Sequence, residues 1–162
     1  MPEDYHLRFG GDSMSEFSEK TAERLSAKHA SSVQRKEYEN NQQQAKKERA
    51  PGLWGETKKA LIDICDEINR DYKEVQILFV LASAGDSVSV ELRQDGEMRS
   101  LGVQFLPASS VVQWATSGGP LAHRGEYPMH VHPDGAVNFS ALSGDQGAAR
   151  YITERMIAAL TG

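Results

Sequence analysis

Cysteine is almost absent from this chain, since Cys65 is the only one among 162 residues. One thiol can neither close a disulfide within the chain nor supply the several thiolates of a cysteine-rich zinc site. Aromatic residues are also scarce, at 7%. No apolar run approaches the ~18 residues of a membrane span. We therefore expect neither a disulfide framework nor a membrane span.

Basic charge is in deficit, because 18 Lys and Arg stand against 23 Asp and Glu, for a net charge of -5. This balance argues against general nucleic-acid binding, which uses basic side chains to neutralise phosphates. Residues 1–9 carry acids and no apolar stretch, so we expect no secretory signal and a cytoplasmic protein. The basic residues of one segment cluster: Lys28, Arg35, Lys36, Lys46, Lys47 and Arg49. We interpret them as solvated helix surface, and salt-dependent contact with nucleic-acid phosphates is the weaker alternative.

Residues 13–49 contain neither glycine nor proline, so nothing there interrupts a helix. The large apolar side chains are too sparse for a core helix, and clean coiled-coil heptads are missing. We predict a flexible N-terminus over residues 1–12 and an extended polar helix over residues 13–50. The candidate partner-binding residues on it are its exposed apolar side chains: Phe17, Leu25, Val33 and Tyr38.

The dipeptide Pro51-Gly52 predicts the end of that helix, because proline cannot continue a helix interior and glycine relaxes the chain. Residues 53–162 should then form a compact α+β domain. A second helix, at about residues 53–72, is indicated by apolar side chains at helical spacing: Trp54, Leu61, Ile64, Cys65, Ile68 and Tyr72. We expect this helix to pack on a sheet.

Residues 75–82 are nearly all apolar, which predicts a central strand buried on both faces rather than an edge strand. Further along, Asp95-Gly96 is a strong signal for a two-residue hairpin turn. Counting back from this turn puts Val90 opposite Leu101 and Val88 opposite Val103, so apolar residues meet apolar residues. A fourth strand is expected over residues 109–116.

The last hairpin turns at residues 133–135, and two registers are open. A two-residue turn would pair His130 and His132 with Phe139 and Val137. A three-residue turn with Gly135 in the left-handed conformation would pair Met129 with Phe139 and Val131 with Val137. We prefer the second register, because it matches apolar residues and suits glycine at the third position. A capping box at residues 143–146 predicts a last helix at about 144–160.

The predicted fold class is therefore α+β. A long N-terminal helix should be followed by a second helix, an antiparallel meander of about six strands, and a C-terminal helix packed on one sheet face. We expect the two later helices to share that face. The other face should keep Leu78, Val80 and Trp114 or Val112, and would need a cover by the N-terminal helix, a second subunit or a ligand.

Four residues are candidates for ligand binding. On a strand, His130 and His132 point the same way, so the two imidazoles could share a metal ion. A catalytic zinc site needs three protein ligands, and no third one is fixed here. His123 and Arg124 close a glycine-rich loop that could bind an anion, although it lacks the lysine of a phosphate loop. The simpler interpretation is that all four are ordinary exposed residues.

Cys65 lies on the apolar stripe of its helix, which favours a small buried hydrophobic residue over a nucleophile. No serine sits in a nucleophile elbow. We predict no catalytic residue, no bound metal and no cofactor. Our first hypothesis is a non-enzymatic protein-binding or adaptor module that acts through the N-terminal helix and an exposed sheet face, on a protein partner or in a homodimer. The alternative is a small ligand- or metal-binding enzyme with its site on the His130/His132 sheet face.

Overall fold

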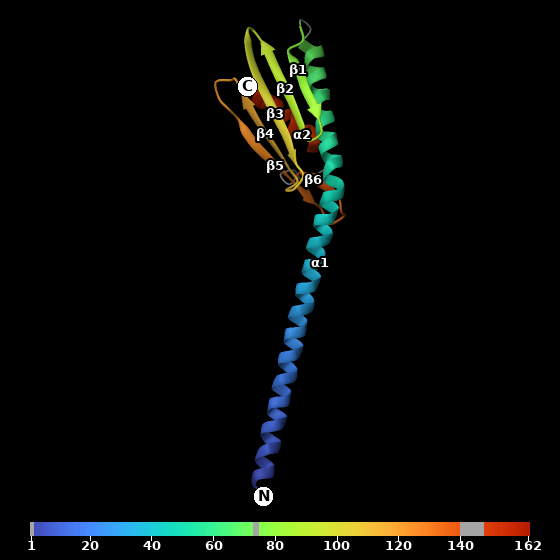
Figure 1. Ribbon diagram of the computed structural model, residues 1–162, viewed down its shortest axis with the longest axis vertical. Helices are drawn as coiled ribbons and strands as arrows, with labels where there is room; N and C mark the ends of the chain where they lie inside the picture. The colour runs from blue at the N-terminus through green and yellow to red at the C-terminus, as the bar shows by residue number, and fades with distance from the viewer. Residues whose placement is uncertain (1, 73–74, 140–147) are drawn as a thin grey trace. The chain divides into compact units, whose positions relative to one another are not determined.

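The computed structural model describes residues 2–72, 75–139 and 148–162, with side chains from residue 15 onward. The chain divides into two units, Met1–Asn41 and Gln42–Gly162. The first helix, α1 (Pro2–Tyr72), contributes residues to both units (Figure 1). Six strands and the second helix, α2 (Ala148–Thr161), belong to the second unit.

In the first unit the chain is helical from Pro2 onward, so the expected long N-terminal helix is present. Two exposed ion pairs at i,i+4 spacing support it: Glu16–Lys20 at 3.3 Å and Arg35–Glu39 at 3.9 Å. Such pairs add only a few tenths of a kcal/mol each, roughly, to an isolated helix. The flexible start over residues 1–12 stays a prediction.

The helix end predicted at Pro51-Gly52 is wrong, because α1 continues through Pro51 to Tyr72. A proline inside a helix removes one backbone hydrogen bond and crowds the preceding turn. Packing offsets this cost: Ala50, Leu53 and Trp54 are all buried in the core of the second unit. The two expected helices are therefore one.

The apolar face predicted for residues 53–72 is confirmed. Trp54, Leu61, Ile64 and Cys65 are buried, and Ile68 and Tyr72 pack against the core at its margin. The Trp54 ring stacks on Phe105, with ring centroids 5.8 Å apart. This face fastens the end of α1 to the sheet.

The strands form one antiparallel meander in the order β1 to β6, which confirms the predicted fold class. They are β1 (Leu78–Ala84), β2 (Ser87–Gln94), β3 (Glu97–Leu106), β4 (Val111–Ser117), β5 (Arg124–Val131) and β6 (Val137–Phe139).

Both hairpin predictions are confirmed. Asp95 and Gly96 have φ of 54° and 78°, and the register pairs Val90 with Leu101 and Val88 with Val103. In the last hairpin, Met129 pairs with Phe139 and Val131 with Val137, and Gly135 has φ of 85°. The three-residue turn closes with the His132 N–H donating to the Ala136 carbonyl at 2.8 Å.

The prediction that residues 75–82 form a central strand is wrong, because β1 is the edge strand and pairs only with β2. The apolar run does not indicate burial on both faces, because some of its side chains are in the core and others are exposed. Leu78 and Val80 lie opposite Leu92 and Val90 and join the core, whereas Leu81 sits where the register shifts at a β-bulge. Leu81 is 53% exposed.

The two helices cover the same sheet face, as expected. On α2, Ile152, Met156 and Leu160 are fully buried in the cluster that also holds the buried face of α1 and the inward side chains of the strands. The capping box predicted at residues 143–146 lies outside the described residues. The first described turn of α2 starts at Ala148.

The prediction of a half-apolar second face is wrong. Residues directly opposite each other share a face, and Val112 lies opposite Phe105 while Trp114 lies opposite Val103. Leu78 and Val80 also join the core. All four residues predicted for the second face therefore lie on the helix-covered side. The uncovered face is formed mainly by small and polar side chains.

Candidate functional site

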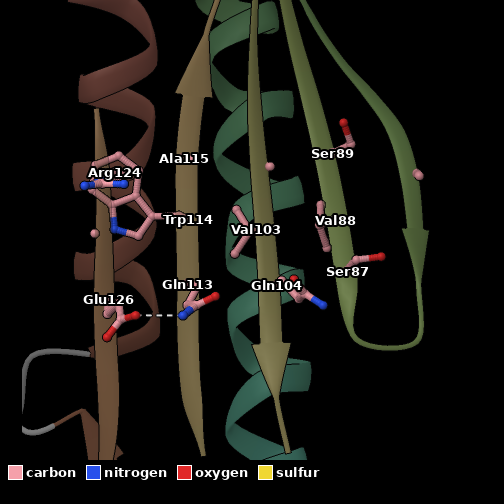
Figure 2. A pocket seen from close by; sticks show the side chains of 13 residues that line it. Ser87, Val88, Ser89, Val103, Gln104, Gln113, Trp114, Ala115, Arg124 and Glu126 are labelled. Atoms are coloured by element: carbon pink, nitrogen blue, oxygen red, sulfur yellow. Dashed lines mark hydrogen bonds between the residues drawn. The ribbon is translucent and has the colours of Figure 1, made fainter. Parts of the chain in front are cut away.

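The uncovered face of the sheet is hollowed, with a volume of about 860 Å³ (Figure 2). The register explains the hollow, because a row of small residues crosses four strands. Ala82 lies opposite Ser89, Ser89 opposite Gly102, and Gly102 opposite Ala115. No long side chain rises from this row, so the space above the backbone stays open. We call this hollow the trough.

Longer polar side chains form one wall of the trough. The adjoining row runs across the strands as Ser87, Gln104, Gln113 and Glu126. Gln113 Nε2 donates to Glu126 Oε1 at 2.7 Å, the dashed line in Figure 2. The wall therefore presents amide donors and acceptors, with one carboxylate at its β5 end.

On the other side of the small row, β1 and β2 carry a compact cluster of side chains on the same sheet face. Glu91 is buried although it lies on the uncovered face, and Arg93 Nε donates to its carboxylate. The Arg93 guanidinium lies 4.4 Å from the centre of the Phe79 ring. On β3 and β4 the same row continues with Ser100 and Ser117, whose hydroxyls are 2.6 Å apart. This row does not line the trough, so the polar row that ends at Glu126 is its defined wall.

Arg124 ends the small row on β5, because it lies opposite Ala115 (Figure 2). Its side chain is exposed, and no ion pair between described residues involves it. Four strand spacings separate β1 from β5, so the trough is about 19 Å long. It thus has a cationic group at one end that is available to a bound carboxylate.

The structure separates the other three ligand-binding candidates from Arg124. His123 lines a cavity of about 40 Å³ instead, and its main-chain N–H donates to Thr116 Oγ1 at 2.9 Å. His130 shares the uncovered face with Arg124, but six residues of extended strand put them about 20 Å apart. The four residues therefore do not form one site.

His130 and His132 lie close to each other, with ring centroids 6.1 Å apart. The neighbouring acids are engaged elsewhere. Asp134 Oδ1 accepts the Ala136 N–H at 3.0 Å within the turn, and Glu126 accepts from Gln113. Over residues 2–72, 75–139 and 148–162, no group of three or more His, Cys, Asp or Glu side chains is placed to hold a metal ion.

The partner-binding candidates on α1 are exposed, but they do not share one face. An α-helix turns by about 100° per residue, so each eight-residue step from Phe17 to Leu25 to Val33 rotates by about 80°. Thr21 and His29 fill the gaps, and the five residues form a continuous i,i+4 row that winds around the helix. Tyr38 lies off this row. A straight helix crossing at an angle can contact part of the row, but not all of it.

Cys65 is buried, as predicted, and its pKa is raised to about 11 by burial and, to a smaller extent, by the charge of Asp66. Relative to the ordinary value of 9.0, the thiolate fraction near neutral pH falls by about 100-fold. We expect the folded chain to resist a thiol reagent at pH 8 and to react stoichiometrically in denaturant. Rapid labelling of the folded chain would make Cys65 a candidate nucleophile.

The same shift sets a pH dependence. Below pH 9.0 the thiol is protonated in both states, so its contribution to the free energy of unfolding is constant. Between 9.0 and about 11 the unfolded chain releases this proton while the folded chain retains it. Stability should therefore fall as pH rises through this window, and a Cys65→Ala variant should lack this part of the fall in alkaline denaturation curves.

The comparisons with known proteins found no match, so a function can be proposed only from these surfaces. No protein-family model matches the chain, and neither a curated protein nor a solved structure matches it. In the described part of the chain, no helix has the length and apolar character needed to cross a bilayer. Fold and site together define an α+β protein with a six-stranded sheet that carries helices on one face and a polar trough on the other.

Proposed function

We propose that this chain is a non-enzymatic protein-binding or adaptor module that receives an extended segment of its partner in the trough. The observation that supports this proposal is the row of small residues that crosses the sheet and ends at Arg124. At ~3.3 Å per residue, a trough about 19 Å long accommodates about six residues of extended peptide.

The chemistry of the trough suits a peptide. Gln104 and Gln113 present side-chain amides along the wall, which can bond with the polar main chain of a bound segment. Arg124 can pair with a carboxylate of the partner, so we expect an acidic residue near one end of the bound segment. Because Arg124 is exposed, this pair should affect the association rate and its salt dependence more than the final affinity.

The N-terminal helix is a second binding surface in this proposal. In the first unit, Phe17 and Leu25 are 69% and 61% exposed. In proteins, most of the stability of a helix comes from packing of its apolar side chains rather than from intrinsic propensity. Burial of part of the winding row from Phe17 to Val33 against a partner would stabilise the helix and contribute to binding.

Filling the trough tests the proposal. A side chain added at Gly102 would meet no atom within 4 Å at its Cβ, and this glycine has no positive φ, so Gly102→Trp should fold normally and occupy the trough. The matched control is Met98→Trp, an exposed position on the same strand and face but outside the trough. Both full-length variants and the wild type would be immobilised and exposed to extract of the source cells.

We expect Gly102→Trp to lose at least one captured protein that wild type and Met98→Trp retain, as quantified by mass spectrometry. Arg124→Ala should weaken capture of the same protein by a few-fold at low salt, in line with about 0.2–1 kcal/mol for an exposed ion pair. The double variant Phe17→Glu with Leu25→Glu tests the helix surface separately, since it should lose only proteins captured through α1. If Gly102→Trp captures the same proteins as wild type in equal amounts, the trough is not the binding surface.

The histidine pair supports a second candidate function, a small ligand- or metal-binding enzyme. Two imidazoles that share a zinc ion have ring centres roughly 5–6 Å apart, given Zn–N bonds of ~2.0–2.1 Å. The observed 6.1 Å is close to this spacing. Titration of Zn²⁺ into the full chain by calorimetry should show binding that His130→Ala with His132→Ala abolishes. Identical titrations of the two proteins would remove this candidate.

A further inference from the structure

The outer edge of β1 is open along much of its length. In an antiparallel edge strand, the N–H and C=O groups of alternate residues point away from the neighbouring strand. Leu78 is such a residue, since its N–H donates to Asn69 Oδ1 at 2.9 Å and its carbonyl accepts from Asn69 Nδ2 at 2.9 Å. Val80 is the next outward-pointing residue.

No hydrogen bond between described residues reaches the outward main chain beyond Leu78 on this strand. At the far end, the Gly85 carbonyl accepts from Trp54 Nε1 at 2.9 Å and from Lys58 Nζ at 3.1 Å. Side chains of α1 therefore occupy both ends of the edge. Residues 80–84 lie between these two anchors.

This edge lacks most of the features that keep edge strands from pairing. Native sheets protect their edges with charged residues, proline or a covering element. Leu78–Ala84 reads LFVLASA, without a charge or a proline, and Leu81 is 53% exposed. β1 does carry two protective devices, the β-bulge between Val80 and Ala82 and the α1 side chains at both ends of its edge, which leave residues 80–84 as the open part.

We propose that β1 pairs antiparallel with β1 of a second copy of this chain, so that the two sheets join across a twofold axis. The occupant of an open edge has to be a strand, because only a strand matches its alternating donors and acceptors. An antiparallel edge is complementary to itself, and an uncharged one meets no like charge in its copy. The exposed Leu81 side chains would be buried in the same contact.

The dimer has a consequence for the trough, which begins at Ala82 of β1. Joining the sheets at β1 places the two troughs end to end on one continuous face, each with Arg124 at its outer end. The pairing itself does not depend on the proposed function, because it needs no other partner. With about five residues per strand, we expect a small interface and a micromolar or weaker dissociation constant.

Sedimentation velocity of the full chain, over concentrations on the order of 1 to 100 µM, tests the proposal. We expect a monomer–dimer equilibrium that Leu81→Lys weakens by at least about tenfold, since a lysine on the edge blocks strand addition. Met98→Lys is the matched control: Met98 is 61% exposed, also apolar, and lies on β3, away from the edge. It should dimerise like the wild type. Unchanged melting temperatures would show that both variants fold.

A second measurement identifies the contact directly. Cys65 is buried, so a cysteine introduced at Ala82, the central residue of the open segment, is the accessible thiol of that variant. Ala82→Cys should form an intermolecular disulfide under mild oxidation, because the central residues of two antiparallel strands lie opposite each other across the twofold axis, whereas Ala108→Cys, in an exposed turn, should not. A monomer at every concentration would overturn the proposal. So would a dimer that survives Leu81→Lys and is lost in Leu25→Glu, because that result assigns the contact to the N-terminal helix. Gly102→Trp should leave the dimer intact, so failure of the trough proposal can be told apart from failure of this one.

Discussion

Replacing Gly118 with alanine is expected to destabilise the chain by about 2–4 kcal/mol. Gly118 has φ of 87°, a conformation that costs an L-residue with a side chain roughly 1–2 kcal/mol. The added Cβ would also collide with the main-chain oxygen of Met98 and lie 3.2 Å from Arg99 Cα. These backbone atoms cannot easily move away, because Met98 and Arg99 pair with Arg93 and Leu92 in the sheet.

The adjacent glycine provides the control. Gly119 has no positive φ, and the nearest atom to an added Cβ is the flexible Arg99 Cδ at 3.4 Å. Gly119→Ala should therefore change the free energy of unfolding by no more than about 0.5 kcal/mol. Thermal denaturation followed by circular dichroism compares the two variants, and for a chain of this size Gly118→Ala should melt roughly 5–15 °C lower. Equal melting temperatures would mean that the β4–β5 loop is not held against β3 as the structure describes.

Short-range geometry explains why the hairpins could be predicted from the sequence. Asp95-Gly96 demands a turn with two positive φ values, and such a turn fixes the register of both flanking strands. The choice of register at Gly135 depended on matching apolar residues across the strands, and the same reasoning identified the buried face of residues 53–72. In each case the deciding residues lie within a few positions of one another.

The errors arose where distant contacts decide the outcome. Pro51 predicts a helix end by its local chemistry, yet burial of Ala50, Leu53 and Trp54 keeps the helix continuous. The apolar run at residues 75–82 cannot show how many neighbours its strand has, so the edge position of β1 was missed. The prediction of a central strand implies an apolar second face, so the first error leads to the second.

The trough was only half predictable. The Asp95-Gly96 register already pairs Ser89 with Gly102 and Ser87 with Gln104. The remaining rows need the pairings of β4 with β3 and β5, and the loops between these strands carry no comparable turn signal. Arg124 is a candidate in the sequence because it follows His123 in a glycine-rich loop. The sheet instead places it beside Ala115 and moves the histidine to another cavity.

Asn69→Ala is expected to cost about 2–4 kcal/mol of stability, because one side chain satisfies three backbone groups at the start of β1. Asn69 Oδ1 accepts the N–H groups of Ile77 at 3.1 Å and Leu78 at 2.9 Å, and Nδ2 donates to the Leu78 carbonyl at 2.9 Å. Ile77 and Leu78 are both buried, so water replaces these bonds poorly. No sequence pattern points to this role, since an asparagine on a helix is usually a solvated residue.

The conservative variant Asn69→Asp distinguishes the contribution of the two bonds that Asn69 accepts from that of the bond it donates. Asn69→Asp keeps an oxygen for the two N–H donors and loses the donor to the Leu78 carbonyl, which still accepts from Gln76 Nε2 at 3.1 Å. We therefore expect it to lose less than half of what Asn69→Ala loses in urea denaturation. A loss as large for aspartate as for alanine would show that the two N–H bonds are not the main contribution.

Asn69 also limits the open edge of β1, so its removal should move stability and self-association in opposite directions. The alanine variant leaves the outward N–H of Leu78 without a partner and lengthens the edge available to a second strand. If β1 is the dimer contact, Asn69→Ala should unfold at lower urea and yet dimerise more tightly than wild type in sedimentation velocity. A variant that is only destabilised, with its dimer equilibrium unchanged or weakened, would place the contact away from Leu78. The double variant with Leu81→Lys should then decide whether β1 takes part at all, because the lysine should cancel the added association without restoring stability.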